Sequence, residues 1–263
     1  NKSMKSSLFV CDQSRPFTKG KFSIVMPCYN AKKTITQSIL SVLNQTYTNF
    51  ELIIVNDGST DETKALVRAL MKKDKRIVFK SLSKNQGVSF ARNEAHHLST
   101  GQYLAFLDAD DSWPENKLER YLGRFKEGHD LVFSEYVRHF QANQTSISLP
   151  RKLNFNQLLK SNFIGLSTGA YDLTRIPFIP FKSVGHEDYL MWLTLFPMAM
   201  NPCGIREPLM HYRADKSGLS SNKLRASLWT WDIYTKHLGL GFIKSFYYFS
   251  HYALANLKRH YLS

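Results

Sequence analysis

The sequence predicts an α/β fold: a doubly wound, mostly parallel sheet flanked by helices, with a helical C-terminal extension. Two observations carry this prediction. Short apolar runs alternate with segments of helical periodicity over residues 22–127. The runs are also nearly continuous, which is typical of strands covered on both faces. Such βαβα alternation favours a parallel sheet with helices on both sides.

Each predicted strand is an apolar run that ends at turn residues, and the four span residues 22–27, 51–59, 76–82 and 103–111. The predicted helices follow them at residues 35–43, 59–70, 89–98 and 112–125. Ser59 and Glu62 have the spacing of a capping box, and Ser112 is a candidate N-cap with Pro114 in the first turn. Sheets of this kind bind ligands beyond the carboxyl ends of their strands.

The pattern changes after about residue 128. Residues 130–137 could form one more strand, whereas "FNQLLKSNF" and "EDYLMWLTLF" look helical. Residues 223–262 are rich in aromatic and basic side chains and look mostly helical. Residues 1–20 are polar, contain Pro16 and Gly20, and indicate an extended lead-in.

Composition narrows the class of protein. The chain has 263 residues, 43% of them hydrophobic, with 35 Lys and Arg against 21 Asp and Glu, a net charge of +14. This excess favours an anionic partner, whether nucleic acid, anionic lipid or a phosphorylated ligand. Cys11, Cys28 and Cys203 are widely spaced and form no CxxC pair, which indicates neither a zinc site nor a disulfide framework. A reduced, cytosolic setting is expected, without a signal peptide or transmembrane helix.

Three carboxylates, those of Asp108, Asp110 and Asp111, follow the fourth predicted strand directly. Like charges this close repel one another, so a positive group should lie among them. Asp108 and Asp110 are two residues apart and project to the same side of an extended backbone. Two such carboxylates suit Mg²⁺ or Mn²⁺, which completes its shell with water and substrate phosphates. The alternative is a solvated acidic loop or charges at a helix N-terminus.

Four segments together resemble family 2 glycosyltransferases with the GT-A fold. They are "SIVMPCYNAKKTITQSILSVLNQTYTNFELIIVNDGSTDET", "NQGVSFARNEA" before "LAFLDADD", "GHEDYLMW", and "MHYR". They occur in the family's order over residues 22–213. The resemblance implies a nucleotide-sugar donor, with a UDP-sugar expected, and transfer with inversion at the anomeric carbon. It also implies use of Mn²⁺ or Mg²⁺.

The resemblance carries site roles over to matching positions. It implies nucleotide-sugar binding by Pro27, Tyr29, Asn30, Asp57, Arg92, Asp108, Ala109 and Arg213. It implies metal binding by Asp110 and Asp108, with His211 as a candidate third ligand. Four of these roles have a structural alternative: loop packing for Tyr29, a turn for Asp57, a solvated helix face for Arg92, and a structural histidine for His211.

Inversion also needs a general base, because the attacking acceptor hydroxyl must lose a proton. The family's Glu-Asp motif supplies it, which implies Asp188 here, with Glu187 as the second candidate. On a helix these neighbours point about 100° apart, so only one should face the sugar. The alternative is an acidic pair at a helix N-terminus.

Within this framework the sequence divides into an N-terminal lead (1–20), a nucleotide-sugar-binding half (21–112), an acceptor-binding half (113–222) and a C-terminal segment (223–263). By analogy, the acceptor is a glycan or a polyprenyl-diphosphate-linked sugar of O-antigen, capsule or lipooligosaccharide synthesis. The alternatives are a basic nucleic-acid-binding module, a sugar nucleotidyltransferase and a haloacid-dehalogenase-type phosphatase. The nucleotidyltransferase would need a Gly-rich loop after the first strand, and the phosphatase motif belongs on the first strand rather than the fourth.

The last predicted feature is an amphipathic helix within residues 236–263. Leu240, Ile243, Tyr247, Leu254 and Leu257 fall roughly on one side of it. Basic residues accompany them: Lys236, Lys244, Lys258, Arg259 and His260. This pattern suits peripheral binding to an anionic membrane surface, such as the inner face of a bacterial inner membrane. The alternative is a helix packed on the catalytic domain, and the sequence predicts no oligomeric state.

Overall fold

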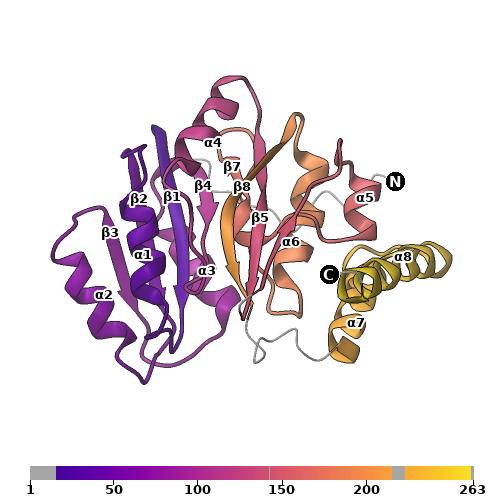
Figure 1. The fold of residues 1–263 in the computed structure, drawn as a ribbon, viewed down its shortest axis with the longest axis horizontal. Coiled ribbons are helices and arrows are strands. Elements are labelled where there is room, and N and C mark those ends of the chain that lie inside the picture. Colours follow the sequence, from indigo (N-terminus) through magenta and orange to yellow (C-terminus); the bar gives the residue numbers. More distant parts are fainter. Residues whose placement is uncertain (1–15, 142, 215–222, 262–263) are drawn as a thin grey trace.

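The computed structural model describes residues 16–141, 143–214 and 223–261, and their strands form one mixed sheet with helices on both faces (Figure 1). The strand order is β3-β2-β1-β4-β7-β5-β6, and β8 pairs with β5 outside this path. A mixed sheet covered by helices confirms the predicted α/β class. Among the described residues, no helix combines the length and apolar character needed to cross a membrane.

The first half of the chain forms the four predicted strand–helix units. The strands are β1 (Thr18–Cys28), β2 (Phe50–Asn56), β3 (Ile77–Ser81) and β4 (Gly101–Phe106). The helices are α1 (Ile35–Leu43), α2 (Thr63–Met71), α3 (Val88–His97) and α4 (Lys117–Lys126). β1 pairs in parallel with both β2 and β4, so the loops after these strands meet at one edge of the sheet.

The second half extends the same sheet. Its strands are β5 (Leu131–Phe140), β6 (Asn143–Ile147), β7 (Ala170–Asp172) and β8 (Pro202–Arg213). β7 lies antiparallel between β4 and β5, and β8 runs parallel to β5. β8 therefore ends at the same edge of the sheet as β1 and β4, which is the lower edge in Figure 1.

Helical elements complete this half. They are α5 (Phe155–Lys160), η1 (Leu166–Thr168), α6 (Glu187–Leu195), η2 (Phe196–Met198), α7 (Lys223–Asp232), the π-helix η3 (Ile233–His237) and α8 (Phe242–Tyr261). In Figure 1, α7 and α8 lie beside α5, on the far side of the molecule from α1 and α2. The expected helical C-terminal extension is thus present.

Alternation along the central strands divides the core between the two faces of the sheet. Ile24 and Met26 of β1 pack with Ile39 of α1 on one face. Val25, from the same strand, packs with Ala91 of α3 and belongs to the cluster on the other face. Successive side chains of a strand point to opposite faces, so a continuous apolar run is what a strand covered on both sides requires.

The predicted helix starts and the predicted lead-in need correction. α2 begins at Thr63, and the Ser59 hydroxyl donates to Asn56 Oδ1 instead of capping the helix. α4 begins at Lys117, because Ser112 is engaged in a bridge with His211. A capping box does form at α5, where Asn154 and Gln157 bond reciprocally. The lead-in is shorter than predicted because β1 already begins at Thr18, and residues 1–15 lie outside the described part.

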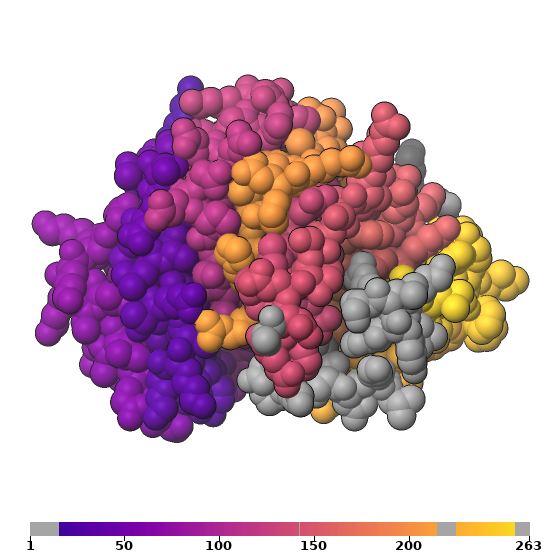
Figure 2. All heavy atoms as spheres, viewed as in Figure 1, coloured from indigo at the N-terminus to yellow at the C-terminus, as the bar shows by residue number. Residues whose placement is uncertain are grey.

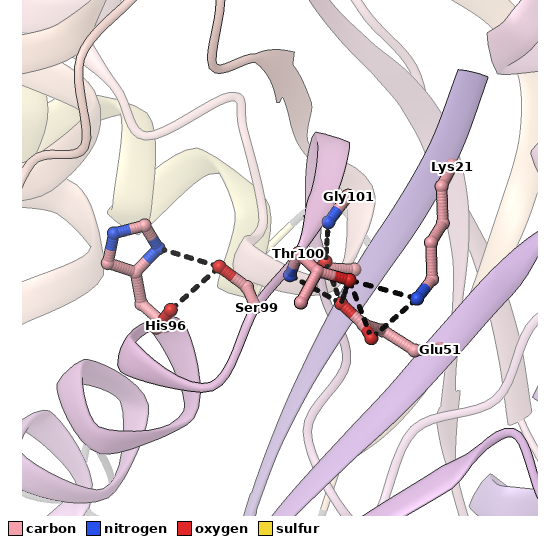
Figure 3. A network of polar contacts seen from close by, with 7 residues as sticks. Lys21, Glu51, His96, Ser99, Thr100 and Gly101 are labelled. Atoms are coloured by element: carbon pink, nitrogen blue, oxygen red, sulfur yellow. Dashed lines mark hydrogen bonds and ion pairs between the residues drawn. The ribbon is translucent and has the colours of Figure 1, made fainter. Parts of the chain in front are cut away.

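The opposite edge of the sheet is held by a buried carboxylate (Figure 3). Glu51 accepts from Lys21 Nζ at 2.7 Å, from the Ser23 hydroxyl at 2.6 Å and from the Thr100 backbone N–H at 2.6 Å. Burial raises the pKa of Glu51, but these hydrogen bonds outweigh it and leave the pKa lower than usual. The network joins β1, β2 and the start of β4 at their amino ends, away from the expected ligand edge.

Candidate active site

The loops after β1, β2 and β3 are tied together at the carboxyl edge of the sheet. Asn30 adopts a left-handed conformation with φ of 48°, and its side-chain oxygen accepts from the Thr60 backbone N–H at 2.9 Å. The Asp57 carboxylate accepts from the backbone N–H groups of Gln86 and Gly87, both at 2.8 Å. Asp57 therefore has a structural role in shaping this edge, beyond a simple turn.

Two more residues of the segment that begins "SIVMPCYN" lie at this edge. Pro27 is buried near the end of β1, whereas Tyr29 is 50% exposed. Exposure of that ring leaves a face available for stacking. Base stacking by Tyr29, which the resemblance implies, stays a prediction, and this exposure leaves room for it.

The Asp108–Asp111 segment turns away from β4, and its three carboxylates have different surroundings. Asp108 is half-buried, Asp110 is exposed and Asp111 is buried. Crowding by protein atoms and the charge of Asp108 raise the pKa of Asp110 to about 6, although the side chain reaches solvent. The Ala109 carbonyl between them accepts from the Ser38 hydroxyl at 2.9 Å, which fixes the turn against α1.

The positive group that the acidic cluster required is Arg92. Its guanidinium donates to Asp108 Oδ1 at 2.8 Å and to Glu187 Oε1 at 2.6 Å. The Arg92 side chain is only 5% exposed, which excludes the solvated helix face considered above. Burial favours its neutral form, but the two carboxylates outweigh this and raise the pKa of Arg92, so it stays charged. Arg92 thus joins the strand-end carboxylates to the Glu-Asp motif.

A second buried cation lies behind Asp111. Lys117 Nζ donates to the Ser167 carbonyl at 2.9 Å and lies 4.6 Å from the ring centroids of Trp113 and Tyr121. The Ser167 hydroxyl donates to Asp111 Oδ2 at 2.6 Å and accepts from the Asp108 backbone N–H at 3.1 Å. Burial raises the pKa of Asp111, with Asp108 and Asp110 adding to it. Burial also lowers the pKa of Lys117, although Asp111 opposes this.

Neither Lys117 nor Ser167 was predicted as a site residue. Lys117 sits among apolar positions of its helix, and nothing in the sequence marks Ser167 as its partner. Together they hold the acidic turn from behind, so that Asp108 and Asp110, rather than Asp111, remain for a ligand.

The Glu-Asp motif opens α6 after a strained residue. His186 has φ of 55° in the left-handed region, which is uncommon for a residue other than glycine. The residue that follows, Glu187, is held by Arg92, and Asp188 lies half-buried next to it in the chain. Burial and then the charge of Glu187 raise the pKa of Asp188 above its usual value. A carboxylate with a raised pKa is a better proton acceptor near neutral pH.

The "MHYR" segment, at the end of β8, lies beside the turn formed by residues 108–111. His211 of β8 pairs through its backbone with Ser112, and Arg213 donates to Gln37 Oε1 of α1 at 2.7 Å. The charge of Arg213 partly offsets the rise in the pKa of Asp110. Arg213 therefore lies where it can contribute positive charge to an anionic ligand at this edge.

The predicted three-ligand metal set is not assembled. In the described part of the chain, no three His, Cys, Asp or Glu side chains are arranged to hold a metal ion. Nδ1 of His211 lies 3.0 Å from Nε2 of His139, so that nitrogen has a protein partner. The carboxylates of Asp108 and Asp110 could supply hard oxygen donors of the kind that Mg²⁺ or Mn²⁺ prefers, and phosphate and water would then complete the shell.

Comparison with known proteins bears on the family of this chain. A family model described as glycosyl transferase family 2 matches residues 23–176. A relative from Escherichia coli, named UDP-Glc:alpha-D-GlcNAc-diphosphoundecaprenol beta-1,3-glucosyltransferase WfgD, is 35% identical over 250 residues, covering 90% of this chain and 94% of the relative.

Two solved structures share the fold. TarS from S. aureus, solved with UDP-GlcNAc, has a TM-score of 0.67 at 20% identity and covers 82% of this chain and 67% of its own. The mannosyltransferase PcManGT from Pyrobaculum calidifontis, solved with GDP-Man and Mn²⁺, has a TM-score of 0.61 at 20% identity, covering 86% and 65%. These likenesses show the GT-A fold, and with the family match they establish that the chain belongs to glycosyl transferase family 2.

Proposed function

We propose that this enzyme transfers a sugar from a UDP-sugar, with inversion, to a hydroxyl group of a polyprenyl-diphosphate-linked glycan. The observation that carries the proposal is the Arg92 bridge between Asp108 and Glu187. It brings the strand-end carboxylates, where a donor diphosphate would lie, next to the motif that contains the candidate base. The names of two similar proteins support the substrates: WfgD is named for a diphosphoundecaprenol acceptor, and TarS was solved with UDP-GlcNAc.

The donor end is formed by the loops of the carboxyl edge. Tyr29 offers an exposed ring for a base, with Pro27, Asn30 and Asp57 shaping the loops around it. Arg213 would face the diphosphate, where a planar guanidinium can bind two oxygens at once.

Asp108 and Asp110 would hold a divalent cation together with the donor diphosphate, and the Ala109 backbone lies between them. Bound there, Mn²⁺ or Mg²⁺ supplies Lewis-acid stabilisation of the leaving phosphate. Binding the cation requires Asp110 in its ionised form, which its raised pKa of about 6 still allows at neutral pH.

Asp188 is the proposed general base. Glu187 accepts a hydrogen bond from Arg92 at 2.6 Å, which directs its carboxylate toward the donor side. Asp188, its neighbour on α6, is left to accept the proton of the acceptor hydroxyl as that oxygen attacks the anomeric carbon. Because the two side chains diverge by about 100° on the helix, one can serve the donor side and the other the acceptor.

The test is Asp188→Asn, assayed for sugar transfer with Mn²⁺ or Mg²⁺ and after chelation. We expect UDP affinity within a few-fold of the native enzyme and kcat lower by roughly 10²–10⁴, the usual contribution of a general base. The matched control is Glu127→Gln, an exposed carboxylate at the end of α4, which should leave kcat unchanged. If kcat is unchanged in Asp188→Asn, Glu187 becomes the candidate base. If the native enzyme keeps full activity after chelation, the proposed role of the metal is wrong.

A further inference from the structure

Helix α8 presents a row of large apolar side chains to solvent. They are Phe242, Ile243, Phe246, Tyr247 and Leu254, with exposed fractions of 73%, 84%, 59%, 48% and 56%; we refer to them as the α8 face. At 3.6 residues per turn, positions 243, 247 and 254 form one stripe, with 242 and 246 beside it. Single exposed apolar residues are ordinary, but a contiguous patch marks a binding surface.

The opposite side of α8 is fixed to the protein. Ser245 is fully buried, and Tyr248, Phe249 and Tyr252 pack against the core cluster. The Tyr248 hydroxyl also donates to Asn156 Oδ1 of α5 at 3.0 Å. The packing of these side chains therefore sets the orientation of α8 and directs the α8 face toward solvent. In Figure 2 the C-terminal segment, in yellow, reaches the surface at one end of the molecule.

The segment that carries the α8 face has charged side chains of one sign only. From Ile233 to the last residue the sequence contains no Asp or Glu. Lys244 is exposed within the row, and Lys160 Nζ of α5 lies 5.1 Å from the ring centroid of Tyr247. A second copy of this chain would bring positive charge against positive charge. An anionic lipid surface complements both the charge and the apolar, aromatic character of the face.

The α8 face is also connected to the candidate base. Trp231 of α7 contacts Phe242 and Phe249, with ring centroids 5.8 and 5.5 Å apart. Two residues earlier, Trp229 lies edge-on to His186 at 5.3 Å, next to the Glu-Asp motif. One helix thus contacts both the outward-facing row and the segment that bears Asp188.

We infer that the α8 face docks on an anionic bilayer surface, with its apolar side chains entering the boundary between headgroups and acyl chains. The inference deepens the proposed function, because a lipid-linked acceptor is presented at such a surface. Docking would be peripheral and salt-sensitive, since part of it is the attraction of Lys244 and Lys160 to lipid charge.

The experiment is co-sedimentation of the full chain with vesicles of phosphatidylcholine alone or mixed with phosphatidylglycerol. We expect binding to the anionic vesicles only, weakening as salt is raised. The double variant Phe242→Ser/Ile243→Ser should lower partitioning at least tenfold, and Lys244→Glu about tenfold. The matched controls are Met200→Ser, a 94% exposed apolar residue elsewhere, and Lys73→Glu, an exposed lysine after α2. Both controls should bind as the native chain does.

Thermal unfolding and transfer to a soluble acceptor analogue are measured on the same samples. Binding lost only in the α8 variants, with unfolding and soluble transfer unchanged, supports the inference. Three results would overturn the inference. The native chain does not bind anionic vesicles, the control variants lose binding as much as the α8 variants do, or the native chain is a dimer that dissociates in the double variant. Vesicle binding without any sugar transfer would refute the proposed function and leave the docking face standing, whereas transfer without vesicle binding would do the reverse.

Discussion

At the scale of single residues, the carboxylates of this enzyme divide into those that stabilise the fold and those that face the ligand edge. Asp57, Asp111 and Glu51 are buried and accept hydrogen bonds from neighbouring protein groups, so these carboxylates stabilise the fold. Asp110 is exposed, and the charge on Asp108 is shared with Arg92. Proximity in sequence therefore does not assign a role, because Asp110 and Asp111 are neighbours with opposite environments.

Glu51 allows this division to be tested through pH. Its folded-state pKa is lowered, so its contribution to stability is present above the unfolded pKa and is lost as pH falls through the folded value. We expect Glu51→Gln to lower the free energy of unfolding by about 2 kcal/mol at neutral pH and to flatten its decline below pH ~4.5. Glu62→Gln, which removes an exposed partner of Lys32, should leave the free energy of unfolding nearly unchanged. Denaturant unfolding at several pH values measures both, and equal losses would contradict the role of the buried network.

At the scale of elements, the sequence predicted the strands that have continuous apolar runs and missed strands that lack them. β1, β2, β3 and β4 were predicted because their apolar runs are long and end at turn residues. β6 is mostly exposed and polar, and β7 has three residues, so neither carries a periodic signal. The acidic cluster was found from its own residues and the Glu-Asp motif by resemblance. The Arg92 bridge and the Lys117–Ser167 support depend on contacts between distant segments that no local pattern encodes.

The packing of α7 on the segment before α6 is such a contact, and it should matter for catalysis. A Cβ atom at Gly185 would lie 1.9 Å from the Trp229 ring, so Gly185→Ala must displace the indole or the backbone that leads to Asp188. We expect a loss of about 1–3 kcal/mol in stability and a lower kcat, with KM for the donor little changed.

Gly241→Ala is the matched control, because nothing lies within 4 Å of its added Cβ. The double variant Gly185→Ala/Trp229→Leu should recover part of kcat by giving the methyl group room. Steady-state kinetics distinguish the outcomes, and a native kcat in Gly185→Ala would show that this contact does not position the base.

At the scale of the whole molecule, the catalytic sheet and the C-terminal segment form one folded unit. The chain belongs to a family of sugar-transferring enzymes, and this argues against the alternatives of a nucleic-acid-binding module, a nucleotidyltransferase and a phosphatase. The two alternatives for the C-terminal helix, by contrast, are not exclusive. Its inner side packs on the core, while its outer side carries the α8 face.

The buried part of this segment makes it necessary for folding. Ile233 and Tyr234 of η3 are fully or almost fully buried, and the Tyr234 hydroxyl donates to the Leu159 carbonyl at 2.6 Å. Removing either side chain would cost roughly 2–5 kcal/mol, and removing residues 223–263 takes away both together with α8. Such a loss is comparable to the total stability of a typical domain, about 5–15 kcal/mol.

We therefore expect the truncated chain to lose its cooperative thermal transition, whereas Phe242→Ser/Ile243→Ser unfolds at the native temperature. Differential scanning calorimetry of the three proteins checks both statements. A truncated chain with the native transition would mean that the segment is an appendage, and its role at a lipid surface could then be tested by deletion. If the transition is lost, deletion confounds folding with docking, and only substitutions confined to the α8 face can separate the two.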